Sequence, residues 1–170
     1  MRDYYYSTFT VNKWISVFHD FTELNQVIID CLTFITDNKW VEIYAFVIMR
    51  DHLHIVWKPN GKRTIGEVGT SFKKFTSRKI VKLLKKIDLN YLEKNFISPR
   101  LDRKFKFWKL DSKHYEMIHE DILIQKIIYI HRNPTKGDYK VCEKPEDYKY
   151  SSAKSYKLKS TRFKFLKLFK

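Results

Sequence analysis

The stretch that decides the fold is "VEIYAFVIMRDHLHIVWK", Val41 to Lys58. It holds two apolar runs, at residues 41–49 and 51–58, and both are rich in the β-branched and aromatic residues that favour strands. A tight connection at Arg50 and Asp51 separates the runs. The stretch therefore predicts two strands that pair with each other.

Two histidines interrupt the second run. Side chains alternate between the faces of a strand, so Leu53, Ile55 and Trp57 should face covering helices, while His52 and His54 share the opposite face. Two neutral imidazoles held in this way can ligate one divalent cation, although a complete site needs a third ligand. Two ordinary surface or core histidines give the same pattern, so the pair needs a partner elsewhere in the chain.

The other segments predict the order β-α-β-β-α-β followed by a helix. The predicted strands lie at residues 4–14, 41–49, 51–58 and 104–110, and the predicted helices at 22–38, 64–86 and 121–133. This order is typical of an α+β, ferredoxin-like (RRM-like) fold, an antiparallel sheet with two helices on one face. The third helix then has the other face available.

We expect one domain over residues 1–156 and a basic C-terminal tail at residues 157–170. The polar stretch near residues 87–102 is expected to be an insertion or a mobile segment. The tail alternates basic and apolar residues, so it could either contact a DNA backbone or have no function.

The charge balance points to a polyanionic partner. The 170 residues carry 34 Lys and Arg against 19 Asp and Glu, a formal net charge of +15, and binding to phosphates releases counterions. Acidic membrane surfaces and a merely lysine-rich protein remain as alternatives. The sequence lacks the roughly 18 consecutive apolar residues of a membrane span, and its two cysteines lack the spacing of a structural zinc site. Two free thiols are the simplest account of them, and this favours a cytoplasmic protein.

The predicted partner of the histidines is a tyrosine on the third helix. Tyr129 lies on a mostly polar stripe, and Asn133 follows it by one helical turn. The same stripe includes Gln125, Lys126 and Arg132, whereas Ile124, Ile127 and Ile128 cover another sector. An amphipathic surface tyrosine would give this pattern too, but here the histidine-bearing sheet face lies opposite.

These motifs together resemble a known family. The stretches "YAFVIMRDHLHIVWKP", "SFKKFTSRKI", "FKFW" and "YIHRNPTKGDYKV" resemble the single-tyrosine HUH transposases, in particular the REP-associated tyrosine transposases, and the likeness runs from about Tyr4 to Tyr156. By position, the resemblance implies that Tyr129 is the nucleophile and that His52, His54 and Asn133 hold a divalent metal ion, Mg²⁺ or Mn²⁺. The family commonly has Met-Pro-Asn before the histidines, whereas this chain has Met-Arg-Asp, which alters the turn rather than the ligands.

The resemblance implies a metal-dependent single-stranded DNA endonuclease and strand transferase that cuts beside DNA hairpins. The DNA contacts would come from basic side chains, namely Lys73, Lys74, Arg78, Lys79, Lys82, Lys126 and Arg132. Such an enzyme would be cytoplasmic and nucleoid-associated, and the sequence does not favour a homodimer over a monomer. The alternatives are a non-catalytic nucleic-acid-binding protein on the same scaffold and a replication initiator, which shares the histidine pair.

Overall fold

The aromatic and β-branched runs of the sequence form an antiparallel sheet. The computed structural model describes residues 3–138 and 140–169, and its strand order is β2-β3-β1-β4. The strands are β1 (Tyr4–Thr10), β2 (Val41–Ile48), β3 (His52–Pro59) and β4 (Lys113–Met117). All three neighbouring pairs are antiparallel, so the predicted ferredoxin-like arrangement is confirmed.

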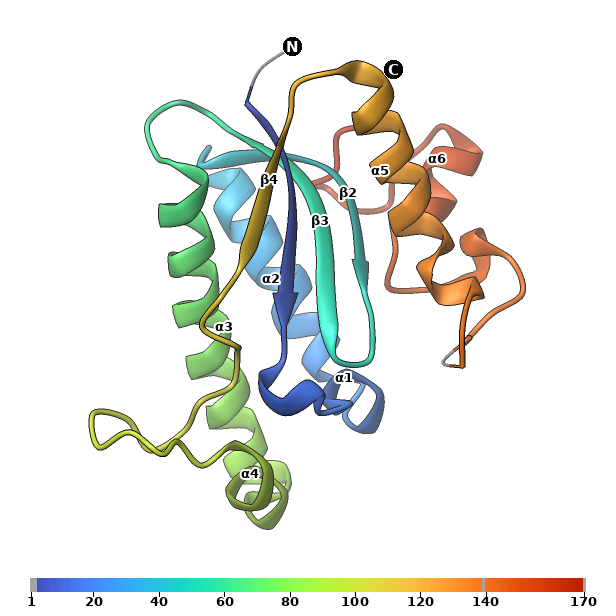
Figure 1. The fold of residues 1–170 in the computed structure, drawn as a ribbon. Coiled ribbons are helices and arrows are strands. Elements are labelled where there is room, and N and C mark those ends of the chain that lie inside the picture. Colours follow the sequence, from blue (N-terminus) through green and yellow to red (C-terminus); the bar gives the residue numbers. More distant parts are fainter. Residues whose placement is uncertain (1–2, 139, 170) are drawn as a thin grey trace.

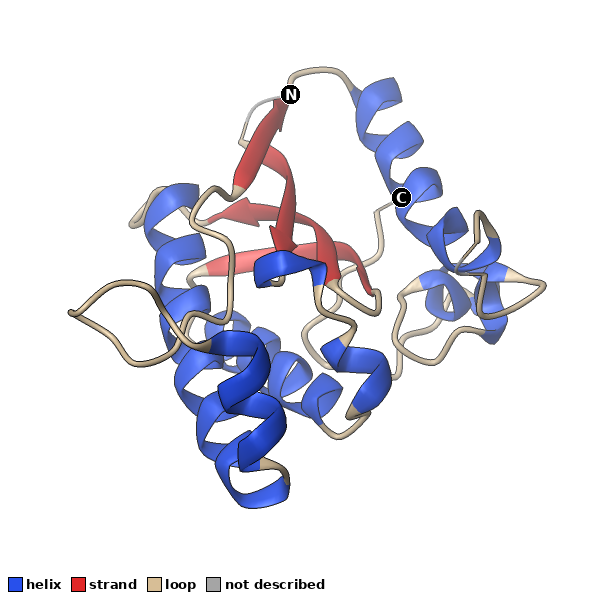
Figure 2. Cartoon of the chain, turned by 60° about the horizontal axis from the view of Figure 1, so that its bottom comes forward, coloured by secondary structure: helices blue, strands red, loops and turns tan. Residues whose placement is uncertain are grey.

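Helices cover both faces of the sheet (Figures 1 and 2). The helices α2 (Leu24–Asp37) and α3 (Ile65–Ile87) lie on one face, and α5 (Glu120–Arg132) lies on the other. The start of α3 is a capping box, in which Thr64 and Glu67 each satisfy a backbone N–H of the other. The shorter elements are α1 (Val17–Asp20), α4 (Leu89–Phe96), α6 (Ala153–Leu158) and 3₁₀ turns at Asn12–Trp14, Asn133–Thr135 and Pro145–Asp147.

The sheet separates two apolar cores. In the larger core, α2 and α3 pack on side chains of β1, β2 and β3, including Leu53, Ile55 and Trp57. In the smaller core, α5 packs on the opposite face of the same strands, where Val56 lies. The predicted alternation along β3 is therefore confirmed, and the histidines belong to the α5 face.

The fourth strand lies elsewhere than predicted. Residues 104–110 form only isolated bridges, at Phe105 and Trp108, whereas β4 comes directly after them at Lys113–Met117 and pairs with β1. The alternation that suggested a strand reflects burial at the end of the larger core, where Phe107 and Trp108 both lose nearly all solvent exposure. The true strand is an edge strand with mostly exposed side chains, so its sequence carries little hydrophobic pattern.

Two further segments differ from the sequence-based expectation. Residues 87–102 contain α4, whose Leu92 and Phe96 are fully buried, so this part is an ordered piece of the core and not the mobile alternative. The first strand ends at Thr10 and a 3₁₀ turn follows it.

The C-terminal segment also packs into the domain. Phe163 and Phe165 lie against Phe46 of β2, with ring centroids 4.9 and 5.3 Å apart. The backbone N–H of Lys167 donates to the carbonyl of Ile43, 2.8 Å away. The described part of residues 157–170 is thus a structural strap along the β2 edge of the sheet instead of a separate tail.

Candidate active site on the α5 face of the sheet

The histidine pair lies at the start of β3. His52 and His54 point to the same face, and their ring centroids are 4.6 Å apart. His54 is 7% exposed and lies among apolar side chains of the smaller core, whereas His52 is partly exposed at the strand end. The strand therefore holds two imidazoles side by side at the rim of a core.

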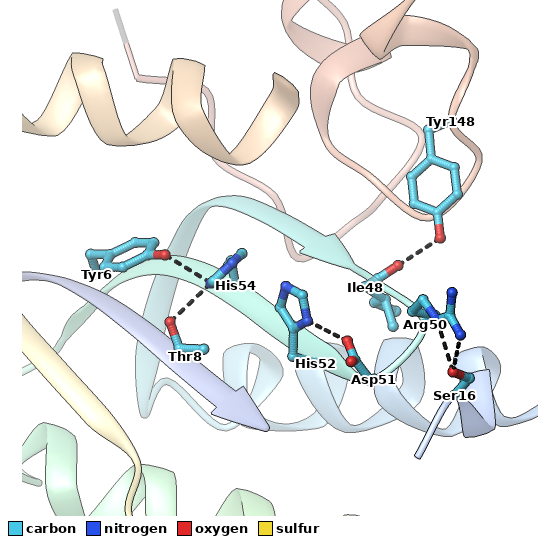
Figure 3. A network of polar contacts seen from close by, with 9 residues as sticks. All are labelled: Tyr6, Thr8, Ser16, Ile48, Arg50, Asp51, His52, His54 and Tyr148. Atoms are coloured by element: carbon cyan, nitrogen blue, oxygen red, sulfur yellow. Dashed lines mark hydrogen bonds and ion pairs between the residues drawn. The ribbon is translucent and has the colours of Figure 1, made fainter. Parts of the chain in front are cut away.

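Two hydroxyl groups of β1 fix the ring of His54. The Nδ1 atom lies 2.8 Å from the Tyr6 hydroxyl and 2.9 Å from Thr8 Oγ1, as Figure 3 shows. The β1–β3 register pairs Thr8 with His54, and Tyr6 lies two residues along on the same face. The ring of Tyr6 also stacks on the imidazole, with centroids 5.4 Å apart. Because Nδ1 is bound by β1, the other nitrogen, Nε2, is the one that can serve a ligand.

A carboxylate orients the second imidazole. The Nδ1 atom of His52 lies 2.6 Å from Asp51 Oδ1. An ionised carboxylate only accepts, so Nδ1 donates its proton and Nε2 keeps its lone pair. The turn itself is held by Arg50, whose Nε and Nη2 donate to Ser16 Oγ at 2.8 and 2.5 Å (Figure 3). Both rings thus have one nitrogen bound by the protein, which is the usual arrangement of metal-ligating histidines.

Burial keeps His54 neutral. Burial chiefly, and then the proximity of His52 and Lys126, lowers the pKa of His54 to about 3. The ring therefore carries no charge near neutral pH, and one of its two nitrogens has a lone pair. This is the protonation state that a metal ligand requires.

Tyr129 faces this pair from α5. Its ring centroid lies 5.8 Å from that of His54 and 6.3 Å from that of Tyr6, with the rings edge to face. The side chain is 46% exposed, so a substrate can reach its hydroxyl. The Nζ atom of Lys126, one turn earlier, lies 5.4 Å from the centre of the Tyr129 ring and 5.0 Å from that of Tyr6. A phenol, a buried imidazole and an ammonium group therefore share one site.

The packing stripe of α5 differs in part from the expected one. Leu123, Ile127 and Ile130 are the buried residues, whereas Ile124 and Ile128 are 42% and 45% exposed. The sequence places the three isoleucines in one sector apart from the polar stripe, and of these only Ile127 is buried. The reason is geometric, because a helix presents a single stripe to the sheet, and here Leu123, Ile127 and Ile130 form it. Tyr129 projects from the border of that stripe toward the histidines.

Asn133 lies at the C-terminal end of α5. Its Nδ2 atom donates to the Tyr129 carbonyl, 3.0 Å away. Among the hydrogen bonds of residues 3–138 and 140–169, none joins Asn133 to either imidazole. The neighbouring His131 turns away from the site toward Ser152 Oγ, 2.8 Å distant, and burial lowers its pKa to about 4.

A family comparison identifies the chain. The family model described as "Transposase IS200 like" matches residues 4–122, which include β1, the histidine pair and β4. The chain belongs to the IS200-like transposase family. The match ends before Tyr129, so it covers the histidines and leaves the tyrosine to be judged from the structure.

Solved structures share the fold of this IS200-like transposase. One is described as "Structure of the REP associates tyrosine transposase bound to a REP hairpin": it is 13% identical, with a TM-score of 0.67, and the match covers 100% of this chain and 94% of the other. Another, a putative transposase from Deinococcus radiodurans R1, is 16% identical with a TM-score of 0.53, and the match covers 78% and 91%. At these identities the likeness concerns the fold, and no curated protein matches the sequence.

The structure divides the predicted DNA contacts of this transposase between two faces. Lys126 lies at the site, and Arg132 lies on the same helix. The residues Lys73, Lys74, Arg78, Lys79 and Lys82 all belong to α3, which packs on the opposite face of the sheet.

The α3 lysines and arginines do not all have the same surroundings. The side chains of Lys73, Lys74 and Arg78 line an open cleft of about 560 Å³ between α3 and residues 102–110. Lys73 is also a structural group, because its Nζ donates to the Leu110 carbonyl at 2.7 Å. Burial lowers the pKa of Lys73, in keeping with this packed position. Exposed side chains such as Arg78 are therefore better placed than Lys73 for a phosphate backbone.

Sequence reasoning missed the groups that hold the imidazoles. Tyr6 and Thr8 come from a strand far away in the chain, and only the β1–β3 register brings them to His54. Asp51 directly precedes His52. A carboxylate next to a histidine in the sequence is the one signal from which its role in orienting the imidazole could have been predicted. In residues 3–138 and 140–169, there is no group of three or more His, Cys, Asp or Glu side chains that could hold a metal ion by themselves. Within the same residues, no helix is long and apolar enough to cross a membrane.

Proposed function

We propose that this transposase is a metal-dependent single-stranded DNA endonuclease and strand transferase. Tyr129 is the nucleophile, and cleavage leaves a covalent 5′-phosphotyrosine intermediate. One observation carries the proposal, the position of Tyr129 beside His54. Their ring centroids are 5.8 Å apart. The two residues lie on different elements, α5 and β3, and α5 is held on the sheet by its own apolar stripe. The alternative, a non-catalytic nucleic-acid-binding protein, gives no reason for a neutral, hydroxyl-anchored imidazole beside an exposed phenol.

The residues present fit a divalent cation. His52 and His54 each have Nδ1 engaged by the protein, by Asp51 in one case and by Tyr6 and Thr8 in the other. In the tautomer in which each Nδ1 donates its proton to these groups, both Nε2 atoms have a lone pair for the metal. The third protein ligand would be Asn133, which supplies an amide oxygen. Two imidazoles and an amide accept Mg²⁺ or Mn²⁺, and fewer than four protein ligands leave coordination positions for the substrate. When bound, the cation would polarise the scissile phosphate and offset the charge that develops there.

The protein supplies the nucleophile and its positioning. A tyrosine hydroxyl has an unperturbed pKa near ~10, so attack requires loss of its proton and an approach to an already negative phosphate. The positive charge of Lys126 lies beside the Tyr129 ring and favours both the phenolate and the phosphate. The phenolate oxygen forms a bond to phosphorus, the bond from phosphorus to the 3′ oxygen breaks, and that oxygen leaves as a 3′-hydroxyl after taking up a proton.

Strand transfer follows from the same intermediate. The phosphotyrosine ester keeps a phosphodiester bond for each one broken, so a 3′-hydroxyl can attack it and release Tyr129. Joining of strands then needs no nucleotide cofactor. The fragment that lies on the 3′ side of the cut stays attached to Tyr129 of α5 through its 5′ phosphate, close to the histidine pair, until a 3′-hydroxyl arrives.

The proposed substrate is a single-stranded or hairpin DNA. The structural relative with the greater likeness is described as bound to a REP hairpin, and this chain has its fold over its whole length. The formal net charge of +15 suits a phosphate backbone. The protein would then act on the chromosome, in the cytoplasm and associated with the nucleoid.

The decisive experiment looks for the covalent adduct. The protein is mixed with a panel of labelled DNA hairpins that carry single-stranded flanks, with Mg²⁺, with Mn²⁺ and with a chelator, and the products are separated on a denaturing gel. We expect a metal-dependent adduct with the unaltered protein and none with Tyr129→Phe, because the substitution removes the attacking oxygen alone.

Tyr115→Phe is the matched control. Tyr115 is 53% exposed on β4 and its ring stacks at 6.4 Å on Tyr6, so it is a second exposed tyrosine near the site. This variant should form the adduct at the rate of the unaltered protein. An adduct that persists in Tyr129→Phe would show that another residue is the nucleophile. Tight hairpin binding with no adduct under any metal would favour the non-catalytic alternative.

A further inference from the structure

The helix α5 has one directional attachment to the rest of the protein. Its apolar stripe holds it on the sheet, but apolar contacts have no preferred direction, so they restrain the rotation of the helix about its axis only loosely. In the part of the chain that the structure describes, His131 is the only α5 side chain that forms a hydrogen bond with another element, through Nε2 and Ser152 Oγ at 2.8 Å. This bond is therefore the contact best suited to set the rotation of α5.

The serine at the other end of the bond is tied to the sheet. Ser152 is fully buried, and its Oγ accepts from the backbone N–H of Phe46 in β2 at 3.0 Å. The backbone N–H of Ser152 donates to the Phe46 carbonyl, also 3.0 Å away. The next residue of β2, Val47, pairs with His54 of β3. His131 is thus connected through Ser152 to the same strand pair that carries His54.

Tyr129 and His131 lie on opposite flanks of α5. Side chains two residues apart on a helix point about 200° away from each other, and Ile130, between these two, is fully buried. On one flank, the ring of Tyr129 meets that of His54. On the other flank, the ring of His131 meets that of Tyr156, with centroids 5.0 Å apart, on α6, which lies beside α5 in Figure 1. A rotation of α5 that breaks the His131 contact therefore also moves the Tyr129 hydroxyl.

We propose that His131 is a positioning residue for the cleavage reaction. Its bond to Ser152 sets the rotation of α5 and so holds the Tyr129 hydroxyl where it meets a phosphate at the His52–His54 pair. The inference rests on the proposed function and adds to it a residue that acts through Tyr129. A displacement of a reacting group by about 1 Å can slow a reaction about 100-fold, so one directional bond outside the site can control the rate.

The first test measures the maximal rate of adduct formation, at saturating hairpin and metal and per folded molecule. His131→Leu removes the ring nitrogens and fills most of the space of the ring, whereas His131→Gln keeps a polar group within reach of Ser152 Oγ. The matched control is His119→Leu. His119 is exposed at the other end of α5, and its side chain forms no capping hydrogen bond.

We expect His131→Leu to lower the maximal rate by at least about tenfold and to leave the dissociation constant of the hairpin unchanged, because the nucleophile alone is misplaced. His131→Gln and the His119→Leu control should react at nearly the rate of the unaltered protein. Equal rates in His131→Leu and His119→Leu would overturn the proposal. Weaker hairpin binding with an unchanged maximal rate would overturn it too, since His131 would then act in DNA binding.

A double variant tests whether His131 acts through Ser152. Ser152→Ala removes the hydroxyl that the imidazole meets. If the two residues act through one bond, the combination of His131→Leu and Ser152→Ala should be no slower than the slower of the two single variants. Losses that multiply in the double variant would mean that the residues act separately, and they would contradict the proposal.

The last test observes Tyr129 without DNA and without cleavage. A 3-fluorotyrosine is placed at residue 129, beside the ring of His54, and its fluorine NMR resonance is recorded. We expect the resonance to shift in His131→Leu and to keep its position in His119→Leu, whereas a loss of stability alone leaves the resonance of folded molecules in place. An unshifted resonance in His131→Leu would refute the proposal. If no hairpin forms an adduct, the proposed function fails, and the fluorine resonance still decides whether His131 positions Tyr129.

Discussion

Two histidines on opposite faces of the sheet are each held by a hydroxyl group of β1, yet only one belongs to the candidate site. Thr8 lies at 2.9 Å from His54 Nδ1 on the α5 face, and Ser7 lies at 2.7 Å from His114 Nδ1 on the α3 face. Consecutive residues of β1 thus orient one imidazole on each side.

The difference lies in what meets the far side of each ring. A Cβ atom placed on Gly69 of α3 would lie 3.0 Å from Cε1 and 3.1 Å from Nε2 of His114. The backbone of α3 therefore closes off that imidazole. Ser7, which is fully buried, also accepts from the indole N–H of Trp57 at 2.8 Å, so the partly buried His114 belongs to a polar link at the edge of the larger core. On the other face, the far side of His54 meets Tyr129, with Lys126 nearby. An anchored histidine becomes a candidate ligand only where the second nitrogen is left accessible.

The largest expected effect comes from replacing one histidine or the other by alanine. We expect His54→Ala to reduce the rate of adduct formation by more than ~100-fold, because it removes a metal ligand. His114→Ala should lower the free energy of unfolding by ~1–3 kcal/mol, since it removes one of the two hydrogen-bond partners of the Ser7 hydroxyl and leaves a gap under α3. Its adduct rate per folded molecule should be unchanged. Gel assays of the adduct, paired with denaturant unfolding, measure both quantities. Equal loss of adduct in the two variants would remove the distinction between the two faces.

The sequence predicts those parts of the site that follow from the regular repeat of side chains along one strand or one helix. Alternation along residues 51–58 places His52 and His54 away from Leu53, and α5 does cover that face. The exposure of Ile124 shows the limit of the same reasoning, because a helix rich in isoleucine offers several candidate stripes and only contact with the sheet selects one.

The parts that the sequence does not predict depend on register and on edges. The hydroxyls of Tyr6 and Thr8 reach His54 only because β1 pairs with β3 in one register. The edge strand β4 has few buried side chains, so its sequence lacks the apolar pattern of a strand. Residues 104–110 have such a pattern but form only isolated bridges. The roles of Tyr129, the two histidines and Asn133 in catalysis stay predictions, because they concern chemistry that geometry alone does not measure.

A smaller effect is expected from the hydroxyl that orients His54. Tyr6→Phe keeps the ring that stacks on the imidazole and removes the hydroxyl that lies 2.8 Å from Nδ1. Loss of a group that orients a metal ligand typically costs ~10- to 100-fold in metal affinity or activity. We therefore expect adduct formation to need a higher concentration of Mg²⁺ or Mn²⁺, with a similar maximal rate once the metal is saturating.

The metal titration distinguishes this role from simple loss of stability. Thr8 still binds Nδ1 in the Tyr6→Phe variant, so the ring should keep its place. A lower maximal rate with an unchanged metal requirement would mean that Tyr6 acts on the reaction in some way other than through His54. Tyr44→Phe is a suitable control, because Tyr44 belongs to the same core and its hydroxyl donates to Glu42 instead.

The smallest expected effect concerns the face without the site. Arg78 is exposed on α3 and lines the cleft of about 560 Å³, so a DNA molecule that wraps around the sheet edge would meet it. Each phosphate contact contributes about 0.7 to the slope of log affinity against log salt concentration for a single strand and about 0.9 for a duplex. We expect Arg78→Ala to reduce that slope by about this amount and to weaken hairpin binding only a few-fold, without changing which phosphate is cut. Lys154→Ala, on α6, is the control. An unchanged slope in Arg78→Ala would mean that the α3 face does not contact the DNA, and that the face carrying the histidines and Tyr129 both binds and cuts the strand.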